Sequence, residues 1–342
     1  MTTLALRTPR DRISLRVPRR ATVVCAALLV VTFAVAVVGI ATGDFPLPLG
    51  DVLATMVGQG DPASSFIVET LRAPRVLTGL LVGAAFGIAG AIFQSVSRNP
   101  LGSPDIVGFT TGSTTGALVV ILVLDESSGP VGLGAVAGGL VAAIAVYVLS
   151  MRNGVQGYRL VLVGIGVAAV LESMNAYLIT RATREDAFAA AHWYVGSLNG
   201  RGWEHVWPIA VALVLIVPIA LAYTRPLALL EMGDDAAKAL GVKVETSRAV
   251  MIFAAVGLTA VGTASAGPIA FVALAAPQVA RRLTRSAAPG LIAAALMGAL
   301  MLAASDVIAQ RLLDADLPVG VVTGALGGIY LGWLLFTGRG RA

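Results

Sequence analysis

The chain has 342 residues, of which 57% are hydrophobic and 13% are charged, and its mean hydropathy is +0.87. A soluble domain carries roughly twice this charged fraction, so the composition excludes a soluble globular protein. The formal net charge of +5 bears on orientation in a membrane, because no basic run is interleaved with aromatic residues as an RNA-binding surface requires. We therefore predict an all-α, polytopic membrane protein.

The N-terminal region combines a basic stretch with a first apolar run. Residues 1–20 are rich in arginine and precede an uncharged run from Ala21 to Ala41. A signal peptide is the alternative interpretation, but this run is longer than the hydrophobic region of a usual signal peptide and is long enough to cross about 30 Å of hydrocarbon. We predict a basic cytoplasmic tail over residues 1–20 and a transmembrane helix after it. The single cysteine, Cys25, is a small apolar residue of that helix.

Nine further apolar runs predict nine more transmembrane helices, which makes ten in all. An even number returns the C-terminus to the side of the N-terminus. On this threading, eighteen of the 24 Lys and Arg residues lie on the N-terminal side, as the positive-inside rule predicts for the cytoplasm. We predict one transmembrane domain over residues 21–338 and a cytoplasmic tail over residues 339–342. The further spans are expected at 74–96, 104–124, 131–150, 159–180, 206–224, 249–265, 268–283, 290–309 and 318–337.

Three of these spans carry a glycine at every fourth position. This spacing places all the glycines of a span on one helix face, where they let two helix backbones approach closely in lipid. We therefore predict closely packed helix pairs at these faces. The glycines are Gly79, Gly83 and Gly87, then Gly108, Gly112 and Gly116, and finally Gly320, Gly324, Gly328 and Gly332.

A polar segment, residues 225–248, separates two apolar runs and faces the cytoplasm on this threading. Asp234 is a candidate N-cap, since its side chain is able to accept a backbone N–H two or three residues on. Residues 235–240 are mostly helix formers, and Gly241 suits the left-handed position that ends a helix. The segment therefore predicts a short helix in the aqueous phase. It is either a docking lever for another protein or a solvated connection that happens to be helical.

Two carboxylates fall inside predicted spans. A charge at mid-membrane is costly, so Glu172 and Asp306 are each expected to face the bundle interior or a wet cavity. Glu172 is either a pathway or proton-relay residue or a protonated carboxyl bonded to a neighbouring helix. Asp306 lies near the outer end of its span, where we predict a structural pair with Arg311.

Two polar connections stand out at the ends of the second span. Arg72 and Arg75 lie on the outer side, against the positive-inside trend, and suit carboxylates of a partner or lipid phosphate. On the cytoplasmic side, residues 97–105 form a turn that Pro100 and Pro104 stiffen. This turn is either a gate at a pore mouth or a plain tight connection.

Enzymatic and nucleotide-binding signatures are missing from the sequence. No Gly-Lys pair occurs, so no P-loop and no ATP site is expected. The two histidines, His192 and His205, lie in one outer segment, which does not favour a metal site, and His192-Trp193-Tyr194 predict a short interfacial helix. We expect no catalytic residue, metal or cofactor in this chain.

Several long segments resemble the permease subunits of bacterial ABC importers for iron-siderophores, haem and cobalamin, which form the FecCD or BtuC-like family. The resemblance extends from the region of Cys25 to the C-terminus. Within the family, SRNPLGSPD, GSLNG and DLPVGVVT are similar to the G-type subunits of ferric enterobactin permeases. The segments that carry the family resemblance are RAPRVLTGLLVGAAFGIAGAIFQSVSRNPLGSPDIVGFTTG, LLEMGDDAAKALGV, AGPIAFVALAAPQVARR and LPVGVVTGALGGIYL.

The resemblance implies a ten-helix permease subunit in the bacterial inner membrane, with both termini cytoplasmic. It implies a sister permease subunit in a heterodimer, two copies of a separate ATPase that binds ATP and Mg, and an extracytoplasmic binding protein or lipoprotein. The implied substrate is a ferric siderophore of the enterobactin or catecholate type. The subunit itself is not an enzyme. Haem and cobalamin are the alternative substrates within the family.

The resemblance also assigns roles to residues of the polar connections. Arg72 and Arg75 match arginines that meet acidic residues of the binding protein, and Arg311 lies near a third such position. Asn99, Pro100 and Leu101 match a cytoplasmic gate. Glu172 has no counterpart in G-type subunits, so the resemblance assigns it no role. The alternative class is a proton-coupled secondary transporter that uses Glu172 as a relay. The ATPase-coupling segment is matched by Glu231, Met232, Gly233, Asp234, Asp235, Ala236, Lys238, Leu240 and Gly241.

Overall fold

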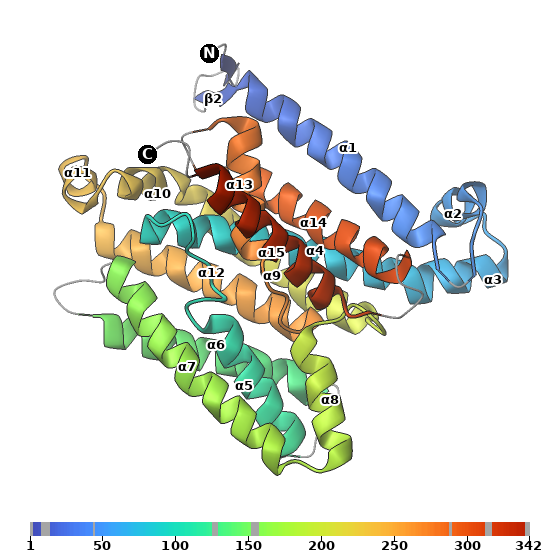
Figure 1. The fold of residues 1–342 in the computed structure, drawn as a ribbon. Coiled ribbons are helices and arrows are strands. Elements are labelled where there is room, and N and C mark those ends of the chain that lie inside the picture. The colour runs from blue at the N-terminus through green and yellow to red at the C-terminus, as the bar shows by residue number, and fades with distance from the viewer. Residues whose placement is uncertain are drawn as a thin grey trace.

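A computed structural model describes residues 3–7, 14–43, 45–124, 129–151, 157–286, 289–311 and 317–338 of the chain. The described part is a helical bundle (Figure 1), which confirms the predicted fold class. Two short strands, β1 (Thr3–Arg7) and β2 (Ser14–Pro18), pair antiparallel before the first helix, so the expected N-terminal tail contains a hairpin. The expected C-terminal tail lies outside the described residues.

Each of the ten predicted spans corresponds to a helix in the described ranges. Seven of the described helices are long and apolar enough to cross a membrane, whereas α5, α13 and the apolar part of α15 are shorter. At a rise of 1.5 Å per residue, the 14 residues of α5 extend only about 21 Å. The ten helices are α1 (Arg19–Ala41), α4 (Ala73–Ser97), α5 (Phe109–Leu122), α6 (Gly129–Ser150), α7 (Gly157–Arg181), α9 (Trp203–Ala222), α12 (Val244–Ala266), α13 (Val272–Thr284), α14 (Leu291–Arg311) and α15 (Val319–Gly338).

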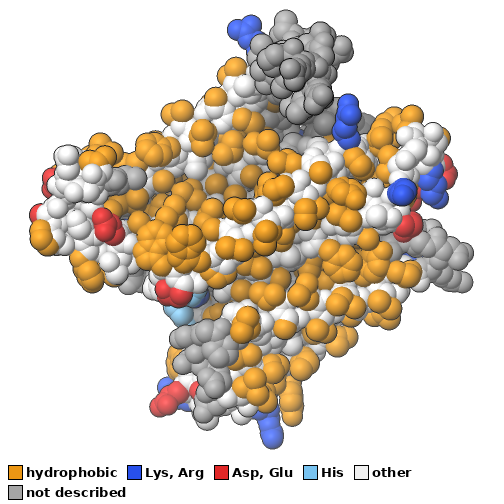
Figure 2. Space-filling model, turned by 180° about the vertical axis from the view of Figure 1, so that it is seen from behind, with side chains coloured by type: hydrophobic (Ala, Val, Ile, Leu, Met, Phe, Trp, Pro, Cys, Tyr) orange, Lys and Arg blue, Asp and Glu red, His pale blue; other side chains and the backbone are white. Residues whose placement is uncertain are grey.

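The remaining elements cap the two ends of the bundle. Figure 1 shows α10 and α11 at the end where α1 begins and α15 ends, while α2, α3 and α8 lie at the opposite end. Figure 2 shows a face covered by hydrophobic side chains, with charged ones gathered at its edges, as a lipid-facing belt requires. The capping elements are α2 (Leu49–Met56), α3 (Pro62–Ser65), the π-helix η1 (Phe66–Arg72), α8 (Arg184–Val195), α10 (Thr224–Glu231) and α11 (Asp234–Ala239).

The central helix is α4, which packs against α12, α13 and α14. Its close contact with α14 depends on glycine, because a Cβ at Gly83 would lie 2.8 Å from the carbonyl carbon of Gly298. Gly116 of α5 meets the backbone of Gly134 and Gly138 on α6 in the same way. The predicted glycine-mediated packing is therefore confirmed for these two pairs of helices.

The glycine face of α15 differs from this prediction. A Cβ added at Gly324, Gly328 or Gly332 would meet no heavy atom within 4 Å in the described chain. By contrast, Gly327 of the same helix packs against the Phe271 ring. Three of the four glycines on the predicted packing face are thus open in the described chain, whereas Gly320 meets the backbone of Val195 at the end of α8, as predicted.

Candidate functional sites at the two ends of the bundle

The coupling segment, residues 225–248, forms two helices rather than one. α10 ends at Glu231, α11 follows from Asp234, and α12 already begins at Val244. Gly233, with φ of 111°, is the N-cap of α11, and Gly241 adopts the predicted left-handed conformation with φ of 81°. The two glycine conformations therefore bound α11, a short helix at the end of the bundle.

Asp234 does not act as the predicted N-cap. It is the first residue of α11, and its carboxylate accepts hydrogen bonds from Arg248 at 2.7 Å and from Arg98 at 3.3 Å. The Arg248 side chain is only 2% exposed, so this pair is largely shielded from solvent. Two cations draw the carboxylate away from the helix terminus, and the charge ties α11 to α12 and to the end of α4.

A second ion pair joins the coupling segment to α13. The guanidinium of Arg281 pairs with Glu231 at the end of α10 and also donates to Ser95 Oγ of α4 at 3.2 Å. These three ion pairs therefore connect both coupling helices to three helices of the bundle. A displacement of the coupling segment has a direct path into the adjoining ends of α4, α12 and α13.

The outward side of the coupling segment is apolar as well as charged. Met232 is 68% exposed and Leu240 is 61% exposed, while Asp235 and Lys238 are also on the surface. Ala237 is buried and packs with Leu230 and Val244. Exposed large apolar side chains beside charges are typical of a protein-docking surface.

The turn over residues 97–105, which we call the gate turn after the role predicted for it, directly follows α4. Arg98 ends α4 in the left-handed conformation, and Asn99 Oδ1 accepts the N–H of Leu101 at 2.9 Å. Gln278 of α13 donates to the carbonyl of Pro100 at 2.6 Å. The turn closes at Asp105, which is partly buried and accepts hydrogen bonds from Ser103 Oγ at 3.2 Å and Thr110 Oγ1 at 2.8 Å. The gate turn is therefore held by α13, and Asn99 directly follows Arg98, which pairs with Asp234 of the coupling segment.

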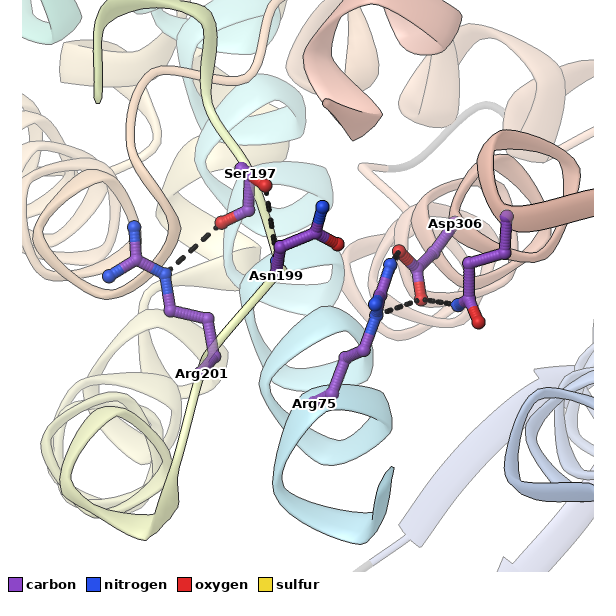
Figure 3. Close-up of polar contacts among 6 residues, drawn as sticks. Arg75, Ser197, Asn199, Arg201 and Asp306 are labelled. Atoms are coloured by element: carbon purple, nitrogen blue, oxygen red, sulfur yellow. Dashed lines mark hydrogen bonds and ion pairs between the residues drawn. The ribbon is translucent and has the colours of Figure 1, made fainter. Parts of the chain in front are cut away.

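At the other end of the bundle, Arg75 and Asp306 form a largely buried ion pair (Figure 3). Arg75 Nη2 lies 2.8 Å from Asp306 Oδ1, and the two side chains are 19% and 5% exposed. Gln310 also donates to Asp306, at 2.8 Å. The predicted pair of Asp306 with Arg311 is wrong, because five residues on a helix place two side chains on different faces. The carboxylate does face the interior, as expected.

Arg72 is also engaged within the chain. Its guanidinium donates to the carbonyl oxygens of Ile40 at 2.9 Å and Phe45 at 2.5 Å. It thereby holds the connection between α1 and α2 against the start of α4. Arg72 and Arg75 line one cleft of about 320 Å³ at this end, whereas Arg311 is an exposed residue at the end of α14.

Glu172 does not face the interior of this subunit, contrary to the sequence-based expectation. It lies on the exposed side of α7, the least buried of the long apolar helices, and accepts a hydrogen bond from the Tyr194 hydroxyl of α8. The bond to a neighbouring helix was one of the two interpretations left open. Of the groups described, no set of three His, Cys, Asp or Glu is placed to hold a metal ion.

Sequence reasoning missed the partners that position these sites. Arg98, Arg248 and Arg281 carry the ion pairs of the coupling segment, and Gln278 holds the gate turn. Arg281 lies 50 residues from its partner, so no local spacing indicates that pair. A weak signal did exist for Arg248, which directly precedes an apolar run, where an unpaired charge would be costly.

The bundle and its projecting coupling segment define the class of the protein, a polytopic membrane permease. The model of the FecCD transport family matches residues 24–337. The ferric enterobactin transport system permease protein FepG of Escherichia coli (strain K12) is 46% identical over 316 residues, which cover 92% of this chain and 96% of FepG. The chain therefore belongs to the FecCD transport family.

Two further comparisons agree with this assignment. The Fe(3+) dicitrate transport system permease protein FecD of Escherichia coli (strain K12) is 35% identical over 298 residues, covering 86% of this chain and 92% of FecD. A solved metal-chelate type ABC transporter in an inward-facing conformation superimposes with a TM-score of 0.83 at 27% identity, covering 92% of this chain and 99% of that chain. The predicted family and fold are thus confirmed.

Proposed function

We propose that this chain is the permease subunit of an ABC importer that moves a ferric siderophore of the catecholate type, such as ferric enterobactin, across the bacterial inner membrane. The substrate follows from the similarity to FepG. One observation carries the mechanism: the coupling segment exposes Met232 and Leu240, while Asp234 ties the same segment to the gate turn through Arg98. A partner that binds the exposed side chains would therefore displace the gate turn together with the segment.

The energy for transport comes from a separate chain. Two copies of a cytoplasmic ATPase bind ATP and Mg and dock on the exposed side of α11, through Met232, Asp235, Lys238 and Leu240. ATP binding displaces the coupling segment, and the Asp234 and Glu231 ion pairs carry this displacement to α4 and α13. A partner shifts the conformational equilibrium only if it contacts the two states differently. The ion pairs and the Gln278–Pro100 bond are the contacts we expect to change.

A sister permease subunit completes the pathway. Glu172 stands on the exposed side of α7, and a carboxylate facing lipid at mid-membrane is costly. Gly324, Gly328 and Gly332 of α15 also lack a partner helix within the described chain. Both faces are explained if a second subunit covers them and encloses a hydrated pathway. We propose a heterodimer with a D-type sister subunit.

The orientation follows from the charge distribution. The N-terminal region, the coupling segment and the C-terminal end of α15 lie at one end of the bundle, which we place in the cytoplasm. The arginine cleft with Arg72 and Arg75 then faces the extracytoplasmic binding protein, with Arg311 at its periphery. Because Asp306 already pairs with Arg75, the acidic residues of the binding protein add to a preformed pair.

Transport in reconstituted vesicles tests this function. The permease pair is reconstituted with its ATPase, and ATP-driven uptake is measured with the binding protein loaded with a ferric catecholate, ferric citrate, haem or cobalamin. We expect uptake of the ferric catecholate. Preference for haem or cobalamin would contradict the substrate, and uptake driven by a proton gradient without ATP would favour a secondary transporter that uses Glu172.

A further inference from the structure

A second, larger cavity lies at the end of the bundle remote from the coupling segment. Its volume is about 730 Å³, and α5, α6, α8, α9 and α12 line it, so we call it the α6–α9 cavity. Apolar side chains such as Val131, Val136 and Val261 form most of the wall. Arg201, Glu204 and His205 form a polar end. A cavity of this size and lining fits an amphipathic molecule.

The polar end holds a cation without a direct counter-ion. Arg201 donates to the carbonyl oxygen of Ser197 at 3.1 Å (Figure 3), and its Nη1 lies 2.9 Å from His205 Nε2. Both partners are neutral acceptors, and no carboxylate of the described residues forms an ion pair with Arg201. Burial lowers the pKa of the Arg201 guanidinium, which nearby Glu204 only partly offsets. An anionic group in the cavity would remove this cost.

His205 positions the Arg201 guanidinium. Because Nε2 accepts from Arg201, the neutral imidazole carries its proton on Nδ1. Nδ1 is buried on the other side of the ring, where Glu204 Oε1 lies 3.2 Å away. The charge of Arg201 therefore stays without a counter-ion among the described residues, and the guanidinium is the group that an anion in the cavity would meet.

The surroundings point to the bilayer as the source of the occupant. Leu133, which lines the cavity, is 75% exposed, and Trp207 on the adjacent turn of α9 is largely exposed. Trp203 and Trp207 stack with ring centroids 6.3 Å apart, and Trp residues concentrate at the headgroup level of membranes. A lipid at this depth would present its phosphate to the polar end and an acyl chain to the apolar wall.

We propose that the α6–α9 cavity binds one phospholipid of the leaflet remote from the coupling segment, with its phosphate held by Arg201 and an acyl chain lying against Val136 and Val261. This inference does not depend on the transport proposal, since it concerns the purified subunit alone. The bound lipid supplies the counter-ion that Arg201 lacks among the described residues and fills a void between five helices.

Native mass spectrometry of the purified full-length chain, titrated with phosphatidylglycerol, tests the proposal. Replacing Arg201 with Gln removes the charge and is expected to weaken retention of one lipid at least about tenfold, as for a lost hydrogen bond to a charged group. Arg201→Lys keeps the charge and should retain part of the affinity. Arg184→Gln, an exposed arginine of α8, is the matched control and should bind as the unmodified protein does.

A second variant tests the apolar part of the cavity. Val136→Trp fills the space beside the acyl chain and should lower lipid retention with Arg201 intact, while thermal unfolding midpoints report whether each variant is folded. Inorganic phosphate is added as a competitor. Unchanged lipid retention in folded Arg201→Gln and Val136→Trp would overturn the proposal. Displacement of the lipid by inorganic phosphate or by a ferric catecholate would also overturn it, because the site would then be a simple anion or substrate site.

Discussion

The two ends of the bundle differ in how their charged side chains are paired. At the coupling end, Asp234 and Glu231 pair with cations of three bundle helices, so the exposed face of the coupling segment is held by the helices behind it. At the other end, Asp306 neutralises Arg75 internally, but Arg201 bonds only to neutral acceptors. The comparison teaches that the charges of the coupling segment are balanced by neighbouring helices, whereas Arg201 has no counter-ion among the described residues, which is why we propose a separate role for each end.

The largest effect is expected where an ion pair of the coupling end is reversed. Asp234→Lys places a cation beside Arg248 and Arg98, so we expect a loss of about 4 kcal/mol in the free energy of unfolding and loss of uptake. Asp235→Lys is the matched control, since Asp235 is exposed, and it should alter only ATPase docking. Equal stability of the two variants in detergent-to-SDS unfolding would refute the internal role of Asp234.

A similar loss is expected at the other end if the buried pair is broken from one side. Asp306→Asn leaves Arg75 uncompensated and should cost about 3 kcal/mol of unfolding free energy. The double variant Arg75→Met with Asp306→Leu should recover most of this loss, because both charges are gone. The same unfolding assay measures both, and a double variant as unstable as the single one would show that the pair's charge does not matter.

A moderate effect is expected at the exposed face of the coupling segment. Met232→Ser with Leu240→Ser removes apolar contact area outside the bundle, so we expect uptake to fall about tenfold with unchanged stability. ATP hydrolysis and uptake measured in the same vesicles separate lost docking from lost folding. Normal uptake by the double variant would leave the segment without a docking role.

The smallest effect is expected at Glu172. Glu172→Gln keeps the side chain's size and its ability to accept from Tyr194, so uptake should stay within about twofold. The measurement is ATP-driven uptake at equal expression. A complete loss of uptake would indicate that Glu172 is a relay residue and would contradict the role proposed for the coupling segment.

Much of the fold follows from the sequence because apolar runs and glycine spacing are local signals. The structure begins α4 at Ala73 and α14 at Leu291, each within one residue of the predicted start. The pair of Arg75 with Asp306 lies outside such signals, because 231 residues separate the partners and only the packing of α4 on α14 joins them. Asp306 and Arg311 looked like partners by proximity, but helical geometry turns them apart.

The sequence predicted where the candidate sites lie but not which contacts connect them. The residues of the coupling segment and gate turn were recognised by resemblance, whereas their connection through Arg98 and Gln278 required the structure. The exposed position of Glu172 was also hidden, since small and apolar residues cover every side of α7. The open glycines of α15 show the same limit, because a sequence pattern does not state which subunit provides the partner helix.

The role of the coupling segment is tested most directly by uptake in vesicles that contain the permease with or without its ATPase. A bundle moved through Asp234 and Glu231 by a nucleotide-hydrolysing partner should transport only when the ATPase and ATP are both present. Transport of a ferric siderophore by the purified permease alone, with no ATPase in the vesicle, would contradict the account.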